Sequence, residues 1–246
     1  MSRAFKLRTL ALAIAFSFAA VGLSRAADKP AEAPKPAAVA VEKPAVDPNP
    51  PQGAKLDANG KPVGEGWISL FNGKDLTGFK FQDEYWKVED GVIHGVTPGN
   101  KEHHYMYTEK SDYDDFEIHG DVKLIGYNSG LCIRIAPTSF DNVPGYQVDM
   151  GDGYWGCLWD ERGAGMVAGP KKEIGNLILK KNDWNHYYVI AQGHHIQIWF
   201  NGVKTVDTVH EKGKLTGPIG FQLCHEGKTD CSFKNLYVRP LKKAEK

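Results

Sequence analysis

The sequence predicts an all-β fold, a two-sheet antiparallel sandwich of jelly-roll type. Short runs that alternate apolar and polar residues recur between Trp67 and Leu241, at roughly the 8 to 12 residue spacing of sandwiches and barrels. No long helical periodicity appears in that region. Many strands, no helix and a single core favour two packed sheets. A closed barrel is the alternative.

Each expected strand is a run with period-two alternation, and turn residues separate the runs. Asn72-Gly73, Asp90-Gly91 and Asn201-Gly202 are hairpin signals, because these pairs tolerate the positive φ of primed turns. The expected strands are 68–71, 86–89, 92–96, 105–108, 116–124, 130–135, 146–150, 157–159, 186–192, 195–200, 203–208, 219–224 and 233–240.

Residues 1–26 are predicted to be a secretory signal peptide. A basic start precedes an apolar run from Leu10 to Leu23, which ends at the small-x-small sequence Ser24-Arg25-Ala26. A retained membrane anchor is the alternative, but the run is shorter than the ~20 apolar residues of a span. We therefore expect export to the periplasm or the medium, with no stable membrane span.

Residues 27–60 are predicted to form a disordered tether, and residues 61–241 one folded domain. The tether is rich in Ala and Pro, and it lacks aromatic residues from Ala27 to about Gln52. Lys and Arg total 30, as do Asp and Glu. This balance, with no basic cluster in the folded part, argues against a nucleic-acid partner.

The four cysteines, Cys132, Cys157, Cys224 and Cys231, lie in the expected domain. Export would permit disulfides. A bridge between Cys224 and Cys231 is slightly favoured, because a turn-like stretch separates them between two expected strands, and Cys132 and Cys157 would then remain as a pair. Four unpaired, half-buried thiols are the alternative. A structural zinc site is not expected, since no close Cys-x-x-Cys pair occurs.

Three expected strands between Phe116 and Met150 place ionisable and amide side chains on one face each. If the three strands are neighbours in one sheet, their polar side chains form a single surface. Such a surface is typical of a polar binding site, while a solvent face with ion pairs is the alternative. The side chains concerned are Asp121, Lys123, Arg134, Gln147 and Asp149.

Several motifs in order resemble the 3-keto-disaccharide hydrolase domain family, long classed as a domain of unknown function. The resemblance covers essentially all of 67–241. The motifs are Leu-Phe-Asn-Gly-Lys-Asp-Leu-Thr-Gly-Phe at 70–79, Trp-Lys-Val-Glu-Asp-Gly-Val-Ile at 86–93, Asp-Phe-Glu-Ile at 115–118, Asn128-Ser129-Gly130 with Arg134, Trp184-Asn185, Trp199-Phe200-Asn201-Gly202, Gly-Pro-Ile-Gly-Phe-Gln at 217–222 and Phe-Lys-Asn-Leu at 233–236.

The resemblance implies a concanavalin A-like sandwich with a carbohydrate ligand in the groove of its concave sheet. Asn128, Gln222 and His225 then join Lys123 and Gln147 as expected substrate contacts. The chain departs from the family at two places. It has Gly-Tyr-Gln-Val-Asp at 145–149 where the family commonly has Gly-Tyr-Glu-x-Gln, and Asp-Val-Lys at 121–123 in place of Glu-x-Arg.

Glycoside cleavage needs a proton donor and a second group that acts as base or nucleophile. The carboxylates near the expected groove are Asp121, Asp149, Asp152 and Glu161. A ketone at C3 of the sugar acidifies the C2 proton, so that cleavage can proceed by elimination. We expect Asp149 as base and Arg134 and Lys123 as electrostatic stabilisers, with Asp121, Arg134 and Asp149 as the catalytic set.

Trp159 and Trp199 are expected to stack on sugar rings, with core packing as an equal alternative. No cofactor and no metal site are expected. The adjacent histidines His103-His104 and His194-His195 point to opposite faces of a strand, so each pair offers one ligand to a common ion. A calcium ion near 149–153 stays open, although that stretch is too short and carries too few acids for an EF-hand.

These observations favour an exported glycoside hydrolase or lyase that acts on a carbohydrate or glycoside. A non-catalytic carbohydrate-binding module is the alternative, because sandwiches of this kind host both functions. The density of ionisable groups on the polar strands favours the enzyme. A structural envelope protein has no positive sequence signal beyond the tether, and the sequence does not determine the oligomeric state.

Overall fold

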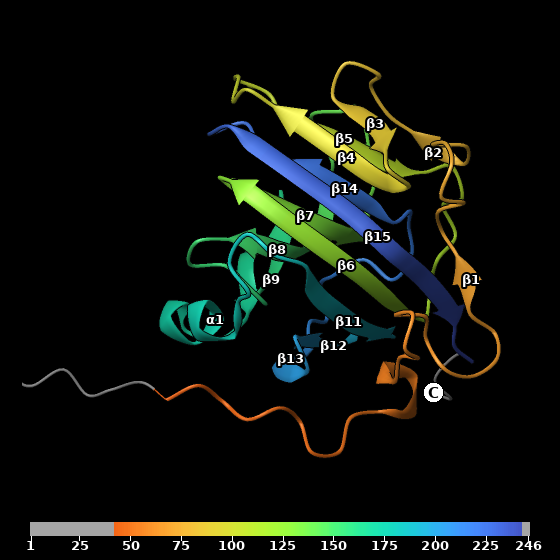
Figure 1. The fold of residues 1–246 in the computed structure, drawn as a ribbon, viewed down its shortest axis with the longest axis vertical. Helices are drawn as coiled ribbons and strands as arrows, with labels where there is room; N and C mark the ends of the chain where they lie inside the picture. Colours follow the sequence, from red (N-terminus) through yellow and green to blue (C-terminus); the bar gives the residue numbers. More distant parts are fainter. Residues whose placement is uncertain (1–41, 243–246) are drawn as a thin grey trace, which may run out of the picture. The chain divides into compact units, whose positions relative to one another are not determined.

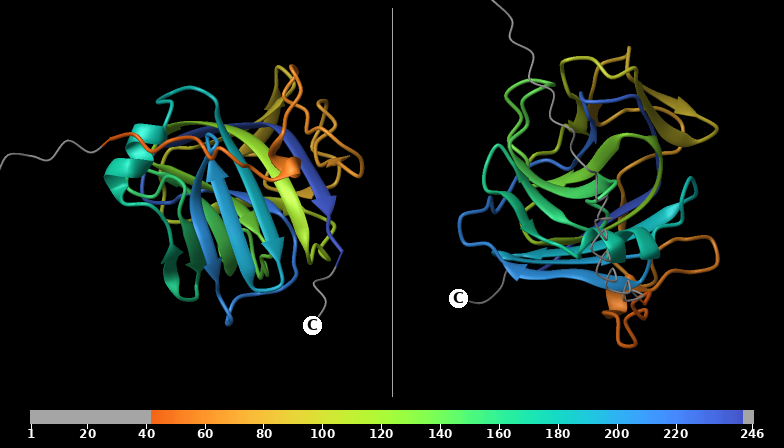
Figure 2. Two further views of the ribbon diagram at one scale, coloured as in Figure 1. Left: turned by 90° about the horizontal axis from the view of Figure 1, so that it is seen from below. Right: turned by 90° about the vertical axis from the view of Figure 1, so that its left-hand side faces the viewer.

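The structure of the protein is a computed structural model that describes residues 42–242. Two antiparallel sheets face each other (Figures 1 and 2). This arrangement confirms the predicted two-sheet sandwich. No helix in the described part of the chain is both long and apolar enough to cross a membrane. The predicted signal peptide lies outside the described residues.

The eight-stranded sheet has the order β13-β12-β11-β6-β15-β4-β3, and β1 also pairs with β15. β6 and β15 are its longest strands and pair over most of their length. Its strands are β1 (Ile68–Ser69), β3 (Trp86–Glu89), β4 (Val92–Thr97), β6 (Phe116–Gly126), β11 (Asn185–Gln192), β12 (His195–Phe200), β13 (Val203–Val209) and β15 (Thr229–Pro240).

The seven-stranded sheet has the order β10-β9-β8-β7-β14-β5-β2. The chain passes between the two sheets several times, and one of these passages is at Tyr127, between β6 and β7. Its strands are β2 (Phe79–Lys80), β5 (His104–Thr108), β7 (Asn128–Ile133), β8 (Gly145–Gly151), β9 (Leu158–Glu161), β10 (Gly165–Ala168) and β14 (Gly220–Leu223).

One apolar layer between the sheets forms the main core. Period-two alternation supplies it, since Ile118 and Val122 of β6 are buried in the same cluster as Val148 of β8. The rings of Phe221 on β14 and Phe233 on β15 lie 4.4 Å apart and join the two sheets directly. Burial of one such ring contributes about 1.5–3 kcal/mol.

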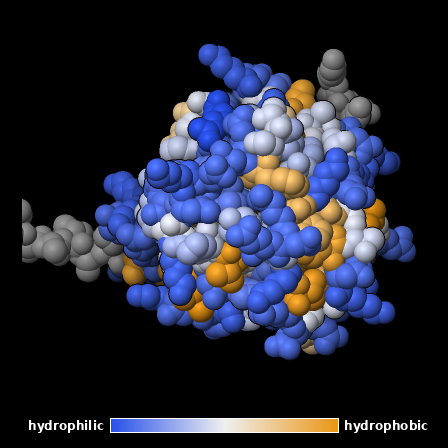
Figure 3. Space-filling view, turned by 90° about the horizontal axis from the view of Figure 1, so that it is seen from above, coloured by the Kyte–Doolittle hydropathy of each residue, from blue (hydrophilic) through white to orange (hydrophobic). Residues whose placement is uncertain are grey.

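Apolar side chains are much rarer on the surface. Figure 3 shows one face of the molecule, which is mostly hydrophilic, with apolar residues in a strip and a few separate spots. Ile68 and Val209 are among the exposed ones, at 55% and 58%. Scattered exposed apolar residues are ordinary on soluble domains.

Two of the three predicted hairpins are confirmed. Asp90-Gly91 connects β3 to β4, and Asn201-Gly202 connects β12 to β13, each with both turn residues at positive φ. Asn72-Gly73 instead makes a turn whose flanking strands do not pair with each other, because β1 pairs with β15. Every predicted strand corresponds to an observed one, with shifts of a few residues at the ends.

The prediction of no helix is wrong at one place. A short helix, α1 (Lys172–Ile178), connects β10 to β11, and its Ile178 packs in the main core. Seven residues are too few to show a helical hydrophobic repeat in the sequence. The structure also adds β2 and β10, two short strands that the expected set does not include.

The favoured Cys224–Cys231 bridge is also wrong. All four thiols are unpaired and buried. Cys231 points from β15 into the main core, whereas Cys224 follows β14 and lines the outer face of the other sheet. The two side chains therefore lie on different faces and cannot meet.

Part of the predicted tether packs on the domain. The indole Nε1 of Trp199 donates to Asp47 Oδ2 at 2.8 Å, and the Asp47 N–H donates to the Gly202 carbonyl at 2.9 Å. Gly53 in the 3₁₀ turn η1 (Gln52–Ala54) is buried, and its carbonyl accepts a hydrogen bond from His119 Nε2 at 2.7 Å. The prediction of a disordered 27–60 is thus corrected for 42–60, while 27–41 lie outside the described residues.

We predict that a variant beginning at residue 55 is less stable than one beginning at residue 42. Loss of 42–54 leaves the Trp199 and His119 donors without their partners. Each lost hydrogen bond costs about 0.5–1.5 kcal/mol, because water can reach the donor once the segment is gone. For a domain of this size we expect a Tm lower by about 3–10 °C, measured by calorimetry. Equal Tm values would show that the segment contributes nothing to stability.

Candidate functional site

A polar groove of about 400 Å³ lies on the outer face of the seven-stranded sheet. The alternation that buries Val148 and Leu131 in the core sends Gln147 and Asp149 of β8 to this outer face. Loops and strand ends complete the walls. The other residues that line it include Lys101, His103, Tyr127, Asn128, Asp141, Tyr154, Trp159, Glu161, Arg162, Gln222, Cys224, His225 and Glu226.

Asp149 is the most perturbed carboxyl group of the groove. It is only 5% exposed, and burial raises its pKa to about 6. Hydrogen bonds to Oδ1 from Asn128 Nδ2 at 2.8 Å and from the Met150 N–H at 2.7 Å partly oppose that rise, because they stabilise the carboxylate. Asp149 therefore changes protonation close to neutral pH, as a general base or acid requires.

Gln147 lies across the neighbouring strand. A Cβ on Gly130 of β7 would stand 2.3 Å from the Gln147 Cγ, so only glycine fits beneath this side chain. The Cys132 thiol donates to Gln147 Oε1 at 3.9 Å. The absence of a side chain at residue 130 thus allows the amide to lie along the groove floor.

Glu161 and Trp159 reach the groove from β9. Burial raises the pKa of Glu161, and the nearby Arg162 guanidinium, 3.4 Å away in an ion pair, partly opposes this. The indole of Trp159 meets the ring of Tyr154 edge to face at 5.9 Å. A raised pKa favours the protonated acid, and an indole beside polar groups suits the apolar face of a sugar ring.

Gln222 supplies another amide from β14. Its Nε2 donates to the Tyr105 hydroxyl at 2.6 Å, whereas its Oε1 is buried and has no hydrogen-bond partner within the described residues. Both side chains are almost fully buried. The pair fixes the orientation of the amide at the base of the groove.

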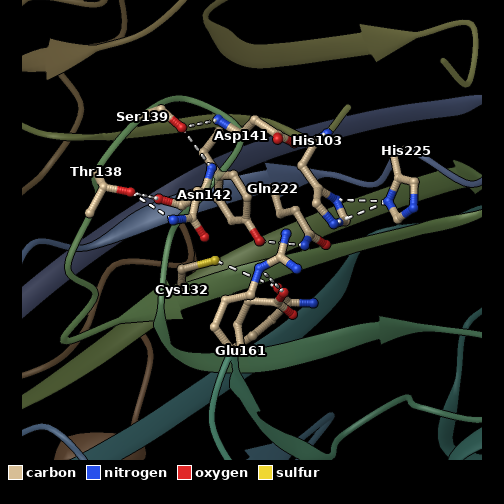
Figure 4. A network of polar contacts seen from close by, with 12 residues as sticks. His103, Cys132, Thr138, Ser139, Asp141, Asn142, Glu161, Gln222 and His225 are labelled. Carbon is tan, nitrogen blue, oxygen red and sulfur yellow. Dashed lines mark hydrogen bonds and ion pairs between the residues drawn. The ribbon is translucent and has the colours of Figure 1, made fainter. Parts of the chain in front are cut away.

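Two histidines, one just before β5 and one just after β14, face each other in the groove (Figure 4). His225 Nδ1 lies 3.1 Å from His103 Nε2, and the rings are nearly perpendicular. The backbone N–H of His103 donates to Asp141 Oδ1 at 2.7 Å. Burial, and then the neighbouring His225, lower the pKa of His103 to about 4.

Of the predicted site residues, six line this groove. Asp149 was expected to be catalytic, and the others to bind substrate. Four further predicted residues lie elsewhere, because β6 and β12 belong to the eight-stranded sheet and Arg134 is held in a loop. The six in the groove are Asn128, Gln147, Asp149, Trp159, Gln222 and His225.

Arg134 has a structural role and does not face the groove. Its side chain is fully buried, and its guanidinium donates to the Asp114 carbonyl at 2.8 Å, the Gly193 carbonyl at 2.6 Å and Asp115 Oδ1 at 3.2 Å. The alternation breaks here, because β7 ends at Ile133 and Arg134 has a φ of 51°. The structure therefore separates Arg134 from Asp149, contrary to the prediction that both face one groove.

Asp121 and Lys123 lie on the outer face of the eight-stranded sheet. Asp121 Oδ1 is 2.7 Å from His186 Nδ1, and the Lys123 ammonium lies 5.3 Å from the centre of the Trp184 ring. The expected single surface required β6, β7 and β8 to be neighbours, but the chain changes sheet at Tyr127. Neither residue belongs to the groove.

Trp199 is also misplaced by the prediction. It is buried on the outer face of the eight-stranded sheet, against Tyr188 and Asp47. The core-packing alternative comes closer, although the packing is against the N-terminal segment.

Sequence reasoning missed His103, Tyr154, Arg162 and Cys224 as groove residues. Only strand pairing brings them together.

The sequence profile of a known family matches residues 66–239, which is most of the described chain. That family is described as the 3-keto-alpha-glucoside-1,2-lyase-like domain. The chain belongs to this family. Membership confirms the resemblance inferred from the motifs and indicates a carbohydrate-related function with a sugar ligand. No curated protein sequence matches the chain.

Solved structures agree on the fold. Two proteins of Parabacteroides distasonis ATCC 8503, each provisionally assigned as a glycosyl hydrolase, share 23% and 25% identity with the chain, with TM-scores of 0.56 and 0.54. The alignments cover 71% and 72% of this chain and 99% and 95% of theirs. The exoplasmic domain of VIP36, solved with Ca²⁺ and a mannose oligosaccharide, has a TM-score of 0.53 at 12% identity, over 72% of this chain and 90% of its own.

We predict that Arg134→Ala destabilises the domain. The substitution removes the guanidinium donors from Asp115 Oδ1 and from the Asp114 and Gly193 carbonyls in a buried position. Breaking one side of a buried ion pair costs about 3–5 kcal/mol, which urea unfolding would measure. The exposed Arg162→Ala variant is the control and should unfold like the parent. A catalytic role for Arg134 would instead leave stability unchanged.

We predict that Asp149→Asn removes one component of the pH dependence of stability, the one that comes from the Asp149 carboxyl group. The pKa of Asp149 rises from 3.8 to about 6 on folding, so its contribution is complete below pH 3.8 and is lost as the pH rises through 6. The integrated difference is about 3 kcal/mol.

Urea unfolding of the parent and the variant at pH 4 and pH 7.5 checks this prediction. Asp152→Asn is the matched control, because that carboxylate is exposed and pairs with Lys172. An identical pH profile in the parent and in Asp149→Asn would contradict a raised pKa.

Proposed function

We propose that this chain is an exported enzyme that cleaves glycosides oxidised at C3 by elimination across C1 and C2 of the sugar. Asp149 is the residue on which the proposal rests. A buried carboxyl with a pKa of about 6, in the groove of a family described by 3-keto-glucoside lyase chemistry, suits abstraction of an acidified C–H proton.

The elimination needs no oxidant. A base removes the C2 proton, and the electron pair first moves toward the C3 carbonyl oxygen to form an enolate. The C1–O bond then breaks, a C1=C2 double bond forms, and the departing oxygen takes a proton. The products are an alcohol and an unsaturated keto sugar. Later addition of water to the double bond would give the overall result of hydrolysis.

Asp149 acts as the base in this scheme, because it is ionised above pH 6 and Asn128 orients its carboxylate. Glu161 acts as the proton donor to the leaving oxygen, since burial raises its pKa. Arg162 and Lys101 replace Arg134 and Lys123 as the cations that stabilise the developing enolate, because both line the groove.

The remaining groove residues hold the sugar. Trp159 offers an apolar face for the pyranose ring, while Gln147, Gln222 and Asn128 offer amides to hydroxyl groups. The basic and apolar start of the chain supports export to the periplasm or the medium.

The experiment is to incubate the full mature chain with a matched pair of glucosides, native and 3-keto, and to follow release of the alcohol. We expect release from the 3-keto substrate only. A deuterium at C2 should slow the reaction and be lost from the sugar product. Direct hydrolysis would keep that deuterium, and would contradict the elimination.

Asp149→Asn should lower kcat by about a hundredfold or more, the usual cost of losing a general base. The control Asp152→Asn makes the same chemical change three residues away and should keep the parent kcat. If the parent binds both glucosides and cleaves neither, the groove belongs to a carbohydrate-binding module and the enzymatic proposal fails.

A further inference from the structure

We propose that the groove binds one divalent transition-metal ion through His103, Cys224 and His225. Among the described residues, one ligand atom from each of these three lies within 4.8 Å of the other two. The two imidazole nitrogens are 3.1 Å apart. Two nitrogens on a tetrahedral zinc ion, at about 2.0–2.1 Å from the metal, stand about 3.3–3.4 Å from each other. The spacing of the two nitrogens is therefore close to that of a zinc pair, and the Cys224 sulfur lies within 4.8 Å of both.

Strand pairing holds the three residues together. β14 pairs with β5 such that Leu223 lies opposite His104, so the chain leaves one strand at Cys224 where it enters the other at His103. The hydrogen bond from the His103 N–H to Asp141 fixes the backbone at this point. The ligands thus come from a rigid sheet end, as a preorganised site requires.

The donor set selects the class of metal. Imidazole and thiolate ligands favour zinc, cobalt and related transition metals, whereas calcium and magnesium prefer oxygen ligands. Cys224 is the one cysteine of the four that lines the groove. Its thiol is therefore placed where a ligand would be needed, unlike the core thiol of Cys231.

The neighbouring histidine does not compete for the ion. His104 follows His103 directly, but its ring nitrogens contact Gln82 and Asn100 at 3.1 and 3.0 Å. The two neighbouring side chains therefore point apart. The second histidine of the site, His225, comes instead from the turn that follows β14.

Three protein ligands are typical of catalytic zinc sites, which keep a further position for substrate or water. Here that position would face the groove that also contains Asp149 and Glu161. A role in the reaction rests on the proposed function: the ion would act as a Lewis acid on the keto or hydroxyl oxygen of the sugar. Metal binding itself does not depend on that role.

The first test measures binding without any sugar. The full mature chain is stripped with a chelator and titrated with Zn²⁺ by calorimetry, and Co²⁺ is used as the spectroscopic probe. We expect one Zn²⁺ per chain, and a thiolate-to-cobalt charge-transfer band that is absent in Cys224→Ser. Absence of stoichiometric binding by the parent would overturn the proposal.

Ligand variants locate the site. His103→Ala, Cys224→Ser and His225→Ala should each weaken Zn²⁺ binding by at least about a hundredfold, since even outer-shell changes cost 10–100-fold. His195→Ala is the control, because that exposed histidine on β12 pairs with Asp207 far from the groove. Circular dichroism and Tm confirm that each variant is folded. If the ligand variants and His195→Ala bind Zn²⁺ equally well, the ion sits elsewhere and the proposal is wrong.

Activity separates this inference from the proposed function. If the stripped protein cleaves the 3-keto glucoside at the parent rate and Zn²⁺ does not bind, the metal site fails while the enzymatic function stands. If Zn²⁺ binds through the three ligands and no glucoside is cleaved with or without it, the metal site stands while the function fails. Loss of kcat on stripping, restored by one equivalent of Zn²⁺, supports both.

Discussion

The apolar layer between the two sheets is the interaction on which the rest of the structure depends. Because each strand turns one side toward this layer and the other away from it, the polar residues of the strands gather on the outer faces. On the seven-stranded sheet these residues form the groove. On the eight-stranded sheet they include Glu117 and His119, which are shielded by Gly53 and Trp67. The same packing constraint therefore produces a binding face on one side and a covered face on the other.

The sequence predicts the strands well, because alternation and Asn-Gly or Asp-Gly turns are local signals. It does not predict which sheet a strand joins. Asp121 and Asp149 each occupy a polar position in a strand that alternates apolar and polar residues. The change of sheet at Tyr127 nevertheless places them on opposite sides of the sandwich. A single residue at positive φ, Arg134, is likewise enough to end a strand and send a guanidinium into the interior.

The groove is predictable where its residues lie on β7, β8 and β9, which follow one another along the chain. His103 and His225 are separated by 122 positions and meet only because β5 pairs with β14. Residues 42–54 were misjudged for a related reason. Composition reports whether a segment can build a core, whereas Asp47 and Gly53 are held by a few hydrogen bonds to the folded domain.

Burial of the four thiols sets a condition on how this chain matures. Burial raises the pKa of Cys157 and Cys231 from 9 to about 12, which lowers the fraction of reactive thiolate about a thousandfold at neutral pH. That protection exists only after the sheets have closed. In the exported protein that we propose, folding must therefore be complete before the thiols are oxidised. A chain that is delayed before its two sheets pack together would be trapped by non-native disulfides.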